Sequence, residues 1–416
     1  MKYDFENLAN RKETACIKWD KDHLKIFCGN ETAAPYWVAD MEYKVAPEID
    51  AAAKKLVNYE TYGYSDYPDI KEKFITFAKK RHNLNLKQEQ ISLCQGVLNA
   101  IACMLNVICE ENDNIIVPFP AYRPFVRIAN NNNLNVLPWK LKRTDDSFEF
   151  DFSTFEDLCK KAKVFILCSP HNPSGKVYSK ETLYKICDIA NKYNVFVISD
   201  EIHADLVFKD TQFYSFIDIA KEKNTKAMVA MAPSKTFNIA GEFFSVSLFN
   251  DLELKKKFDK FRVALHCSSS PYFSTTLARE AYDKGYDWLM EAIVVLEKNA
   301  RYIENYMQEN IKEIKPMKAQ ASFICFWDCR ELLPYIEQDK LNHPELYKLE
   351  ANSETGLASM FFAQRANICL NDGTWFGGDE YKGYVRFNYG TSLDDIKTAL
   401  DKVKKAVDEL LNTYRK

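Results

Sequence analysis

A lysine lies close behind a short apolar run in the second half of this 416-residue chain. The run, Ala227 to Met231, has the length and composition of a buried strand. Lys235 follows it between the small hydroxyl residues Ser234 and Thr236. An amine that is held there and partly desolvated is able to attack an aldehyde and form a Schiff base. Because a lone lysine at a strand end is more often a solvated surface charge, this segment alone does not establish a site.

Two upstream segments repeat the pattern of a strand followed by a polar loop. Val195 to Ser199 leads into Asp200, and Val164 to Cys168 leads into a turn-rich loop that contains Asn172. Ligands of open α/β sheets bind at the carboxyl ends of the strands. We therefore expect the acid, the amide and the amine of Lys235 to meet at one edge of a sheet.

These three groups suit pyridoxal 5'-phosphate as a cofactor. Lys235 would hold its aldehyde as an imine, Asp200 would keep its pyridine nitrogen protonated, and Asn172 would hydrogen-bond the 3-oxygen of its ring. Each position also has an ordinary structural explanation, with Asp200 as a helix N-cap and Asn172-Pro173 as a simple turn. Because all three groups occur in order at strand ends, the sequence favours the cofactor site.

Further motifs surround these residues along almost the whole chain. They are Trp37-Val38-Ala39-Asp40-Met41-Glu42-Tyr43, Tyr62-Gly63-Tyr64-Ser65, Pro120-Ala121-Tyr122, Ser169 to Lys176, Asp200-Glu201-Ile202-His203, Ser234-Lys235-Thr236-Phe237-Asn238 and Gly383-Tyr384-Val385-Arg386-Phe387-Asn388. With them the chain resembles the class I/II aminotransferase family of fold-type I pyridoxal-phosphate enzymes. Within that family it is similar to the cystathionine β-lyase-like branch of C–S lyases.

The middle of the chain alternates short Val-, Ile- and Phe-rich runs with amphipathic stretches. This pattern is typical of an α/β fold in which helices cover both faces of a mostly parallel sheet. The resemblance specifies a fold-type I transferase, with a mixed, mostly parallel sheet and a smaller α+β domain. The expected elements are strands at Ile115 to Val117, Val164 to Cys168, Val195 to Ser199, Ala227 to Met231 and Ser245 to Phe249, and a helix over Lys180 to Tyr193 that Asn194 closes.

The chain is long enough for two domains. We expect residues 46–280 to form the large cofactor-binding domain and residues 281–416 a small C-terminal α+β domain. A helical stretch through Tyr302 and Tyr306, followed by the strand candidate Ser322 to Asp328, supports the second domain. The resemblance implies that residues 1–45 form an N-terminal segment that joins the small domain.

A phosphate site is expected where Gly96, Val97 and Leu98 open an apolar helix, because a helix N-terminus presents backbone N–H groups to an anion. A plain strand-to-helix turn is the alternative. The hydroxyl of Ser234 would add a donor. Many aminotransferases place an arginine near the position of Phe243, and the C–S lyase branch lacks it. The resemblance implies instead that Tyr64 reaches the phosphate from a neighbouring subunit, so that a homodimer shares its active sites.

Two side chains are expected to contact the ring and the substrate. Tyr122 would stack on the pyridine ring and border the substrate, although core packing would also explain it. Arg386 is the candidate for binding the α-carboxylate of an amino-acid substrate, since a guanidinium pairs well with carboxylates. Without the resemblance, a surface salt bridge would be the better explanation of Arg386.

His203 distinguishes the branches, because aminotransferases of this family usually have tyrosine at this place whereas the C–S lyases have histidine. Its imidazole would hydrogen-bond near the cofactor ring, or it would be a buried histidine without a catalytic role. Glu242 departs from the apolar residue usual in the branch, which puts the details of substrate fit in doubt.

The resemblance implies a pyridoxal-phosphate-dependent C–S β-lyase that cleaves L-cystathionine or other cysteine S-conjugates to pyruvate, ammonia and a thiol. An aminotransferase of amino acids is the alternative, because both reactions begin when a freed Lys235 removes the α-proton of the substrate. A third hypothesis is a cofactor-loaded regulatory protein that acts by binding a partner.

Composition limits the partners of the chain. A net charge of −3 leaves no basic excess for nucleic acid. No apolar run approaches the roughly 18 residues of a membrane span, and the first residues lack the apolar core of a signal peptide. We therefore expect a cytoplasmic protein without nucleic-acid or membrane partners. The 12 cysteines form no Cys-x-x-Cys pair and the histidines are few and scattered, so neither disulfides nor a metal site are expected.

Overall fold

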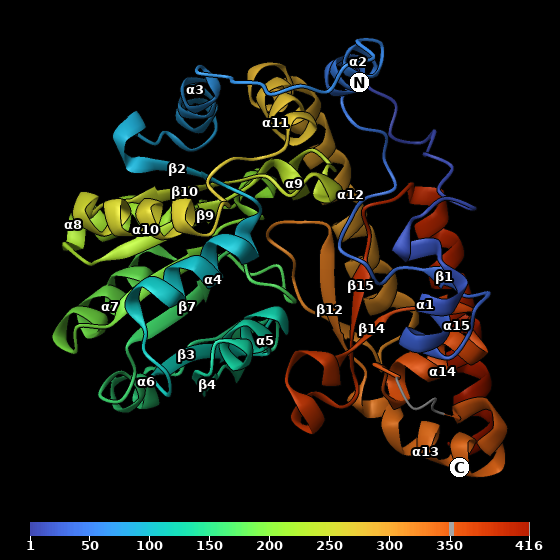
Figure 1. The fold of residues 1–416 in the computed structure, drawn as a ribbon. Coiled ribbons are helices and arrows are strands. Elements are labelled where there is room, and N and C mark those ends of the chain that lie inside the picture. The colour runs from blue at the N-terminus through green and yellow to red at the C-terminus, as the bar shows by residue number, and fades with distance from the viewer. Residues whose placement is uncertain (349–352, 416) are drawn as a thin grey trace.

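Seven strands form the central sheet of the computed structural model, which describes residues 1–348 and 353–415 (Figure 1). The order is β2-β10-β9-β8-β7-β3-β4, and β10 alone runs against its neighbours. The strands are β2 (Ile91–Cys94), β3 (Asn114–Phe119), β4 (Asn135–Lys140), β7 (Val164–Cys168), β8 (Phe196–Asp200), β9 (Ala227–Met231) and β10 (Ser245–Phe249).

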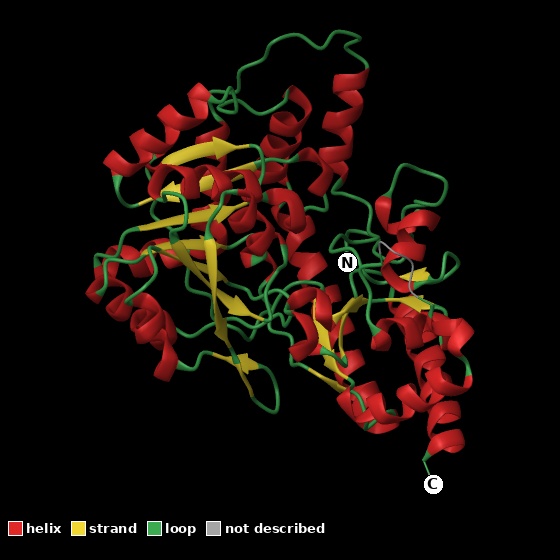
Figure 2. Ribbon diagram, turned by 60° about the horizontal axis from the view of Figure 1, so that its bottom comes forward, coloured by secondary structure: helices red, strands yellow, loops and turns green. Residues whose placement is uncertain are grey.

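Helices cover both faces of this sheet, because successive side chains of each strand point to opposite faces (Figure 2). In β7, Val164 and Ile166 pack into one core cluster, whereas Phe165 and Leu167 pack into another. The helices of the first cluster are α4 (Val97–Ile108), α5 (Pro124–Asn131) and α10 (Leu252–Ala264). The second cluster includes α6 (Phe152–Cys159), α7 (Lys180–Lys192) and α8 (Phe216–Lys223), and it continues into helices beyond this sheet.

A second, antiparallel sheet lies beside the first and has the order β11-β12-β15-β14 (Figure 1). Its strands are β11 (Lys315–Pro316), β12 (Ile324–Asp328), β14 (Asn371–Asp372) and β15 (Tyr384–Asn388). The helices of this part are α12 (Tyr286–Asn310), α13 (Leu333–Asn342), α14 (Leu357–Arg365) and α15 (Leu393–Tyr414). A short hairpin, β5 (Lys142–Arg143) with β6 (Phe148–Glu149), extends from the large sheet.

The N-terminal segment packs against this second part. It contains α1 (Lys21–Cys28) and β1 (Ala34–Pro35), and β1 pairs in parallel with β13 (Ile368–Cys369). This pairing supports the proposed assignment of residues 1–45 to the small domain. The remaining helices are α2 (Pro47–Val57), α3 (Ile70–His82), α9 (Pro233–Thr236) and α11 (Tyr272–Lys284). In Figure 1 the stretch between α2 and α3 runs as an extended chain across the top of the molecule.

The predicted α/β fold class is confirmed. The predicted strands at Val164 to Cys168, Ala227 to Met231 and Ser245 to Phe249 have the bounds that the structure shows, and Val195 to Ser199 is displaced by one residue. Asn194 closes α7 with a left-handed backbone at φ 53. Two strands of the large sheet were not predicted: β2 is short, and β4 is an edge strand that contains a proline.

The register of three parallel strands fixes the edge at which the predicted site lies. Cys168 at the end of β7 pairs with Asp200 at the end of β8, and Asp200 pairs with Ala230 in β9. The loops that follow β7, β8 and β9 therefore leave the sheet side by side. Among the described residues, no helix combines the length and apolarity that a bilayer crossing requires, and no cluster of His, Cys, Asp and Glu is suited to hold a metal ion.

Gly285 joins α11 to α12 at a point that has no room for a side chain. A Cβ there would lie 2.4 Å from the ring of Phe237 and 2.6 Å from the carbonyl oxygen of Ala281. We expect Gly285→Ala to lower the free energy of unfolding by about 1–3 kcal/mol, because the Phe237 ring has to shift within a packed core. Denaturant melts of the cofactor-free protein measure this loss. Gly63→Ala is the control, since nothing lies within 4 Å of its added Cβ; equal stability of the two variants would contradict the packing argument.

Candidate active site

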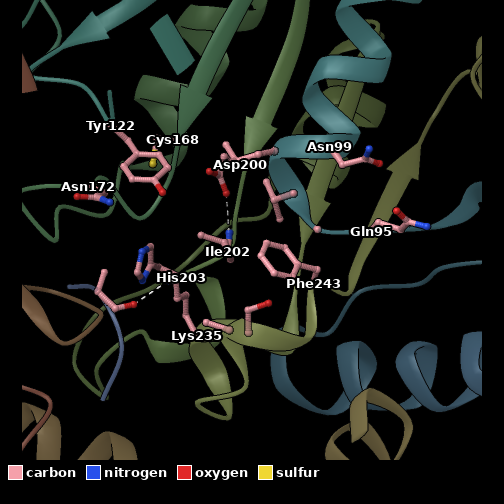
Figure 3. Close-up of a pocket in the computed structure, with 16 residues that line it drawn as sticks. Gln95, Asn99, Tyr122, Cys168, Asn172, Asp200, Ile202, His203, Lys235 and Phe243 are labelled. Carbon is pink, nitrogen blue, oxygen red and sulfur yellow. Dashed lines mark hydrogen bonds between the residues drawn. The ribbon is translucent and has the colours of Figure 1, made fainter. Parts of the chain in front are cut away.

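A cavity of about 380 Å³ lies at the carboxyl ends of β7, β8 and β9 (Figure 3). All but two of the site residues expected from the sequence line this cavity, the exceptions being Tyr64 and Arg386. The lining residues among them are Gly96, Val97, Leu98, Tyr122, Asn172, Asp200, His203, Ser234 and Lys235. The structure thus brings together groups that are spread over some 140 residues of sequence, from α4 to α9.

Lys235 belongs to α9, a helix of only four residues that begins with Pro233. Its Nζ donates a hydrogen bond of 2.7 Å to the carbonyl oxygen of Ala39. Burial disfavours the charged form and lowers the pKa of the amine to about 8, although the nearby carboxylate of Asp40 acts in the opposite direction. Near neutral pH a fraction of this amine is therefore unprotonated and nucleophilic.

Asp200 is the last residue of β8 and is 4% exposed. Its Oδ1 accepts the backbone N–H of Ile202 at 3.0 Å, and burial raises the pKa of its carboxyl group to about 6. The alternative explanation as a helix N-cap is wrong, because the next helical turn, η3 (Ala204–Leu206), has His203 before it. A cationic ring nitrogen beside Asp200 would lower its pKa again and keep it ionised.

Arg386 does not line the cavity but forms a hydrogen bond with Asn172, which does. Its Nη1 donates to Asn172 Oδ1 at 3.0 Å, and its Nη2 donates to the carbonyl oxygen of Trp37 at 2.6 Å and to Asn371 Oδ1 at 2.7 Å. The side chain is buried, and no carboxylate among the described residues forms a salt bridge with it, while its Nε has no hydrogen-bond partner. Burial lowers the pKa of the guanidinium to about 10, so it stays charged at neutral pH. A buried cation without an anionic partner suits the carboxylate of a ligand.

His203 lies between the cavity and the second sheet. Its Nδ1 and the Oγ of Ser322 are 2.8 Å apart, and burial lowers the pKa of the imidazole to about 3. The ring is therefore neutral at physiological pH. Figure 3 shows it between Asn172 and Lys235, which places a neutral hydrogen-bonding group at the reacting side of the cavity.

Residues 37–43 form a strap that contributes Ala39 to the cavity lining, and the carbonyl oxygen of Ala39 accepts the hydrogen bond from Lys235. Asn238, behind α9, and Asn388, on β15, donate side-chain hydrogen bonds to its backbone. The accepting carbonyl groups are those of Met41 and Tyr43 for Asn238, and those of Val38 and Asp40 for Asn388. The motif of residues 37–43 did not by itself predict this strap. The signal for it was the two asparagines, Asn238 and Asn388, in the motifs that carry Lys235 and Arg386.

The end of the cavity at α4 is suited to a phosphate group. Gly96 adopts φ +91, which favours glycine, and no side chain caps the helix that begins at Val97. The N–H groups of Val97 and Leu98 and the hydroxyl of Ser234 are thus placed to meet an anion. Lys235 is the one cationic side chain among the described residues that line the cavity, so a phosphate dianion needs further donors.

Tyr64 does not reach the cavity of its own chain. Its side chain is fully exposed on the stretch between α2 and α3. Phe243, which is 66% exposed, lines the cavity beside Gly96. The resemblance predicted that Tyr64 acts across a subunit boundary, and that role stays a prediction.

The cavity holds the groups that pyridoxal 5'-phosphate needs. They are an amine for its aldehyde, an acid for its ring nitrogen, an amide for its ring oxygen and a helix N-terminus for its phosphate. Tyr122 borders the same space, with its ring 5.9 Å from that of Trp375. Its pKa is raised by burial, so the phenol is neutral and its ring face is suited to an aromatic partner. The residues present therefore fit this cofactor.

Comparisons with known proteins agree with this geometry. Residues 39–403 match the family model of class I and II aminotransferases. Cystathionine β-lyase PatB of Bacillus subtilis is 30% identical over 95% of this chain and 98% of its own. Cystalysin from Treponema denticola, whose structure contains pyridoxal 5'-phosphate, is 28% identical with a TM-score of 0.87 over 99% of this chain and 100% of its own.

A further similar structure is that of a pyridoxal-phosphate-bound protein from Clostridium difficile, described as a proposed aminotransferase. It is 30% identical with a TM-score of 0.87, over 97% of this chain and 100% of its own. The chain therefore belongs to the class I and II aminotransferase family, and its cofactor is pyridoxal 5'-phosphate.

Proposed function

We propose that the chain is a C–S β-lyase that cleaves L-cystathionine or another cysteine S-conjugate to pyruvate, ammonia and a thiol. The observation that carries this proposal is the near full-length similarity to cystathionine β-lyase PatB, in a chain that brings His203 to the same cavity as Lys235 and Asp200. The small-molecule substrate is an amino acid, and its carboxylate and amine match the charges that the cavity offers.

The cofactor would be held along the length of the cavity. Asp200 would pair with its ring nitrogen, Asn172 with its ring oxygen, and Tyr122 would cover one ring face. The backbone N–H groups at the start of α4 and the hydroxyl of Ser234 would hold its phosphate. When bound, the cofactor supplies an electron sink for the carbanion that forms at the substrate Cα.

Lys235 has two roles in this proposal. Its neutral amine would hold the aldehyde of the cofactor, and with a substrate bound the same Nζ would take the proton from the substrate Cα. The lowered pKa of about 8 supports both roles, because an amine with an ordinary pKa would be almost fully protonated at neutral pH.

Arg386 would bind the substrate carboxylate, with Asn172 between it and the cofactor. Its charge is not compensated by a carboxylate of the described chain, so a substrate anion would remove the cost of burying it. The hydrogen bonds from Arg386 to Asn172, Trp37 and Asn371 fix its position before the substrate arrives, which lowers the entropy lost on binding.

An aminotransferase is the second candidate, since the same residues perform the first steps of both reactions. The similarity to the Clostridium difficile structure favours it. The two reactions part where the Cβ–S bond either breaks or stays intact, and this depends on how that bond is aligned. His203, in place of the tyrosine usual in aminotransferases, supports the lyase.

We also propose a homodimer with shared active sites. Among the described residues, none that lines the phosphate end of the cavity is cationic, while the side chain of Tyr64 is fully exposed on the stretch that precedes α3. Exposed apolar side chains nearby, Val57 at the end of α2 and Tyr59 and Tyr62 on the same stretch, offer a surface for a second copy. A cytoplasmic location stays a prediction.

Incubation with L-cystathionine separates the two candidate reactions. A lyase releases pyruvate, ammonia and a free thiol in equal amounts without any 2-oxo acid. We expect this result because loss of the thiolate needs no second substrate. Pyruvate by coupled reduction and thiol by a colorimetric reagent are the measurements. A reaction that proceeds only when a 2-oxo acid acceptor is added would reject the lyase.

Recovery of the cofactor by the stripped protein should depend on the ionisation of Lys235. Only the neutral amine attacks the aldehyde, so the rate of recovery should rise with pH and level off above about 8. The visible absorbance of the bound cofactor measures this rate. Lys235→Ala is the control and should give no such band. A rate that continues to rise toward the ordinary lysine pKa of about 10.4 would contradict the burial argument.

Mixed dimers test the sharing of sites. Tyr64→Phe and Lys235→Ala should each be impaired alone, because each removes one contributor from every site. A purified heterodimer of the two has one site with both residues intact and should regain about half of the wild-type rate. Assays of tag-separated heterodimers measure this recovery. Absence of recovery in verified heterodimers would show that Tyr64 acts within its own chain or not at all.

A further inference from the structure

A buried carboxylate outside the cavity connects the segments that carry the reactive groups. Asp205, in η3, is 4% exposed. Its Oδ2 accepts a hydrogen bond of 2.7 Å from the hydroxyl of Thr236, and its Oδ1 lies 2.6 Å from Nε2 of His82. The side chain of His82 is 4% exposed and Thr236 is fully buried, so water does not compete for these bonds.

The three residues come from distant parts of the chain. His82 ends α3, Asp205 follows the loop of Asp200 and His203, and Thr236 is the residue after Lys235. One carboxylate therefore ties the loop of the acid and the imidazole to the turn of the amine.

Other contacts hold Asp205 itself in place. Arg81 donates from Nε to the carbonyl oxygen of Asp205 and from Nη2 to that of Val207, at 3.1 and 2.9 Å. On the other side, the N–H of Ser322 donates to the carbonyl oxygen of Leu206 at 3.0 Å. The loop after β8 is thus fixed from α3 and from the second sheet, and Asp205 has little freedom to move.

The lysine turn needs such an anchor. A helix of four residues is too short to be stable by its own hydrogen bonds, since the conformational entropy lost in forming the first turn outweighs the free energy of its first hydrogen bond. Backbone hydrogen bonds at its end run from the N–H of Phe237 to the carbonyl oxygen of Pro233 at 2.9 Å and from the N–H of Ile239 to that of Ser234 at 3.1 Å. The Thr236 hydroxyl lies 3.4 Å from the carbonyl oxygen of Ala232, a longer contact than its 2.7 Å bond to Asp205. A hydrogen bond to a buried carboxylate is roughly twice as strong as one between neutral groups. The Thr236–Asp205 bond is therefore a strong external restraint on where Lys235 lies.

We propose that Asp205 is a positioning residue, which acts through Thr236 to hold the Lys235 amine in place relative to Asp200 and His203. The role rests on the proposed function, because it concerns the same amine and the same reaction. Asp205 touches neither substrate nor cofactor in this account. Loss of the Thr236–Asp205 bond would leave every group of the cavity present but displace the amine.

Threonine variants test this role with little change in volume. Thr236→Val removes the hydroxyl and keeps the shape, whereas Thr236→Ser keeps the hydroxyl. We expect Thr236→Val to lower kcat on the order of 10²-fold with little change in KM, because a small displacement of a reacting group is costly. The visible circular dichroism of the bound cofactor should weaken as well. Thr236→Ser should restore both values.

Thr225→Val is the matched control, since Thr225 is 1% exposed and precedes the other end of β9. It should leave kcat and the visible dichroism as in the wild type. Asp205→Asn is a second variant, which keeps the shape of the side chain and removes its charge, and it should change both values in the same direction as Thr236→Val.

Two results would overturn the proposal. One is a Thr236→Val protein that keeps the wild-type kcat and dichroism, even if its melting temperature falls. The other is an equal loss of kcat in Thr225→Val. The visible band of the wild-type protein and its absence in Lys235→Ala test the proposed function separately, so failure of one claim is distinguishable from failure of the other.

Discussion

Burial of the Lys235 amine is the constraint on which the rest of the site depends. Removal from water lowers its pKa to about 8 and makes a nucleophile and base available near neutral pH. The same desolvation raises the pKa of Asp200 to about 6 and lowers that of His203 to about 3. Desolvation in a single cavity therefore gives an amine, an acid and an imidazole three different states of ionisation. Arg386 remains a buried cation beside them and is suited to bind an anion.

The fold forms this cavity by joining a mostly parallel sheet to an antiparallel one. The parallel strands β7, β8 and β9 end in register, so that their loops meet at one edge. The antiparallel sheet contributes Arg386 and Asn388 from β15 and Ser322 from the approach to β12. The strap at residues 37–43 is hydrogen-bonded to both parts through Asn238 and Asn388, and its carbonyl oxygen at Ala39 accepts the hydrogen bond of the amine. Neither part alone would exclude water from Lys235.

The sequence predicted those features that depend on local pattern. Three strands of the large sheet were bounded correctly because each is a short apolar run followed by polar turn residues. Lys235, Asp200 and Asn172 were identified for the same reason, since each follows such a run. The edge strand β4 was not predicted because Pro138 interrupts its apolar run, and a proline argues against a central strand. Other contacts join segments far apart in sequence, and no sequence periodicity predicts them. They are those of Ser322 with His203 and of Asp205 with His82 and Thr236.

The central claim is that the amine of Lys235 carries the cofactor covalently. Borohydride reduction of the wild-type protein, followed by proteolysis and mass spectrometry of the peptides, tests it most directly. The account requires a reduced pyridoxyl phosphate adduct on the peptide that contains Lys235, and on no other lysine in equal amount. Protein that is saturated with the cofactor but yields no adduct at Lys235, or yields it at another lysine, would contradict the account.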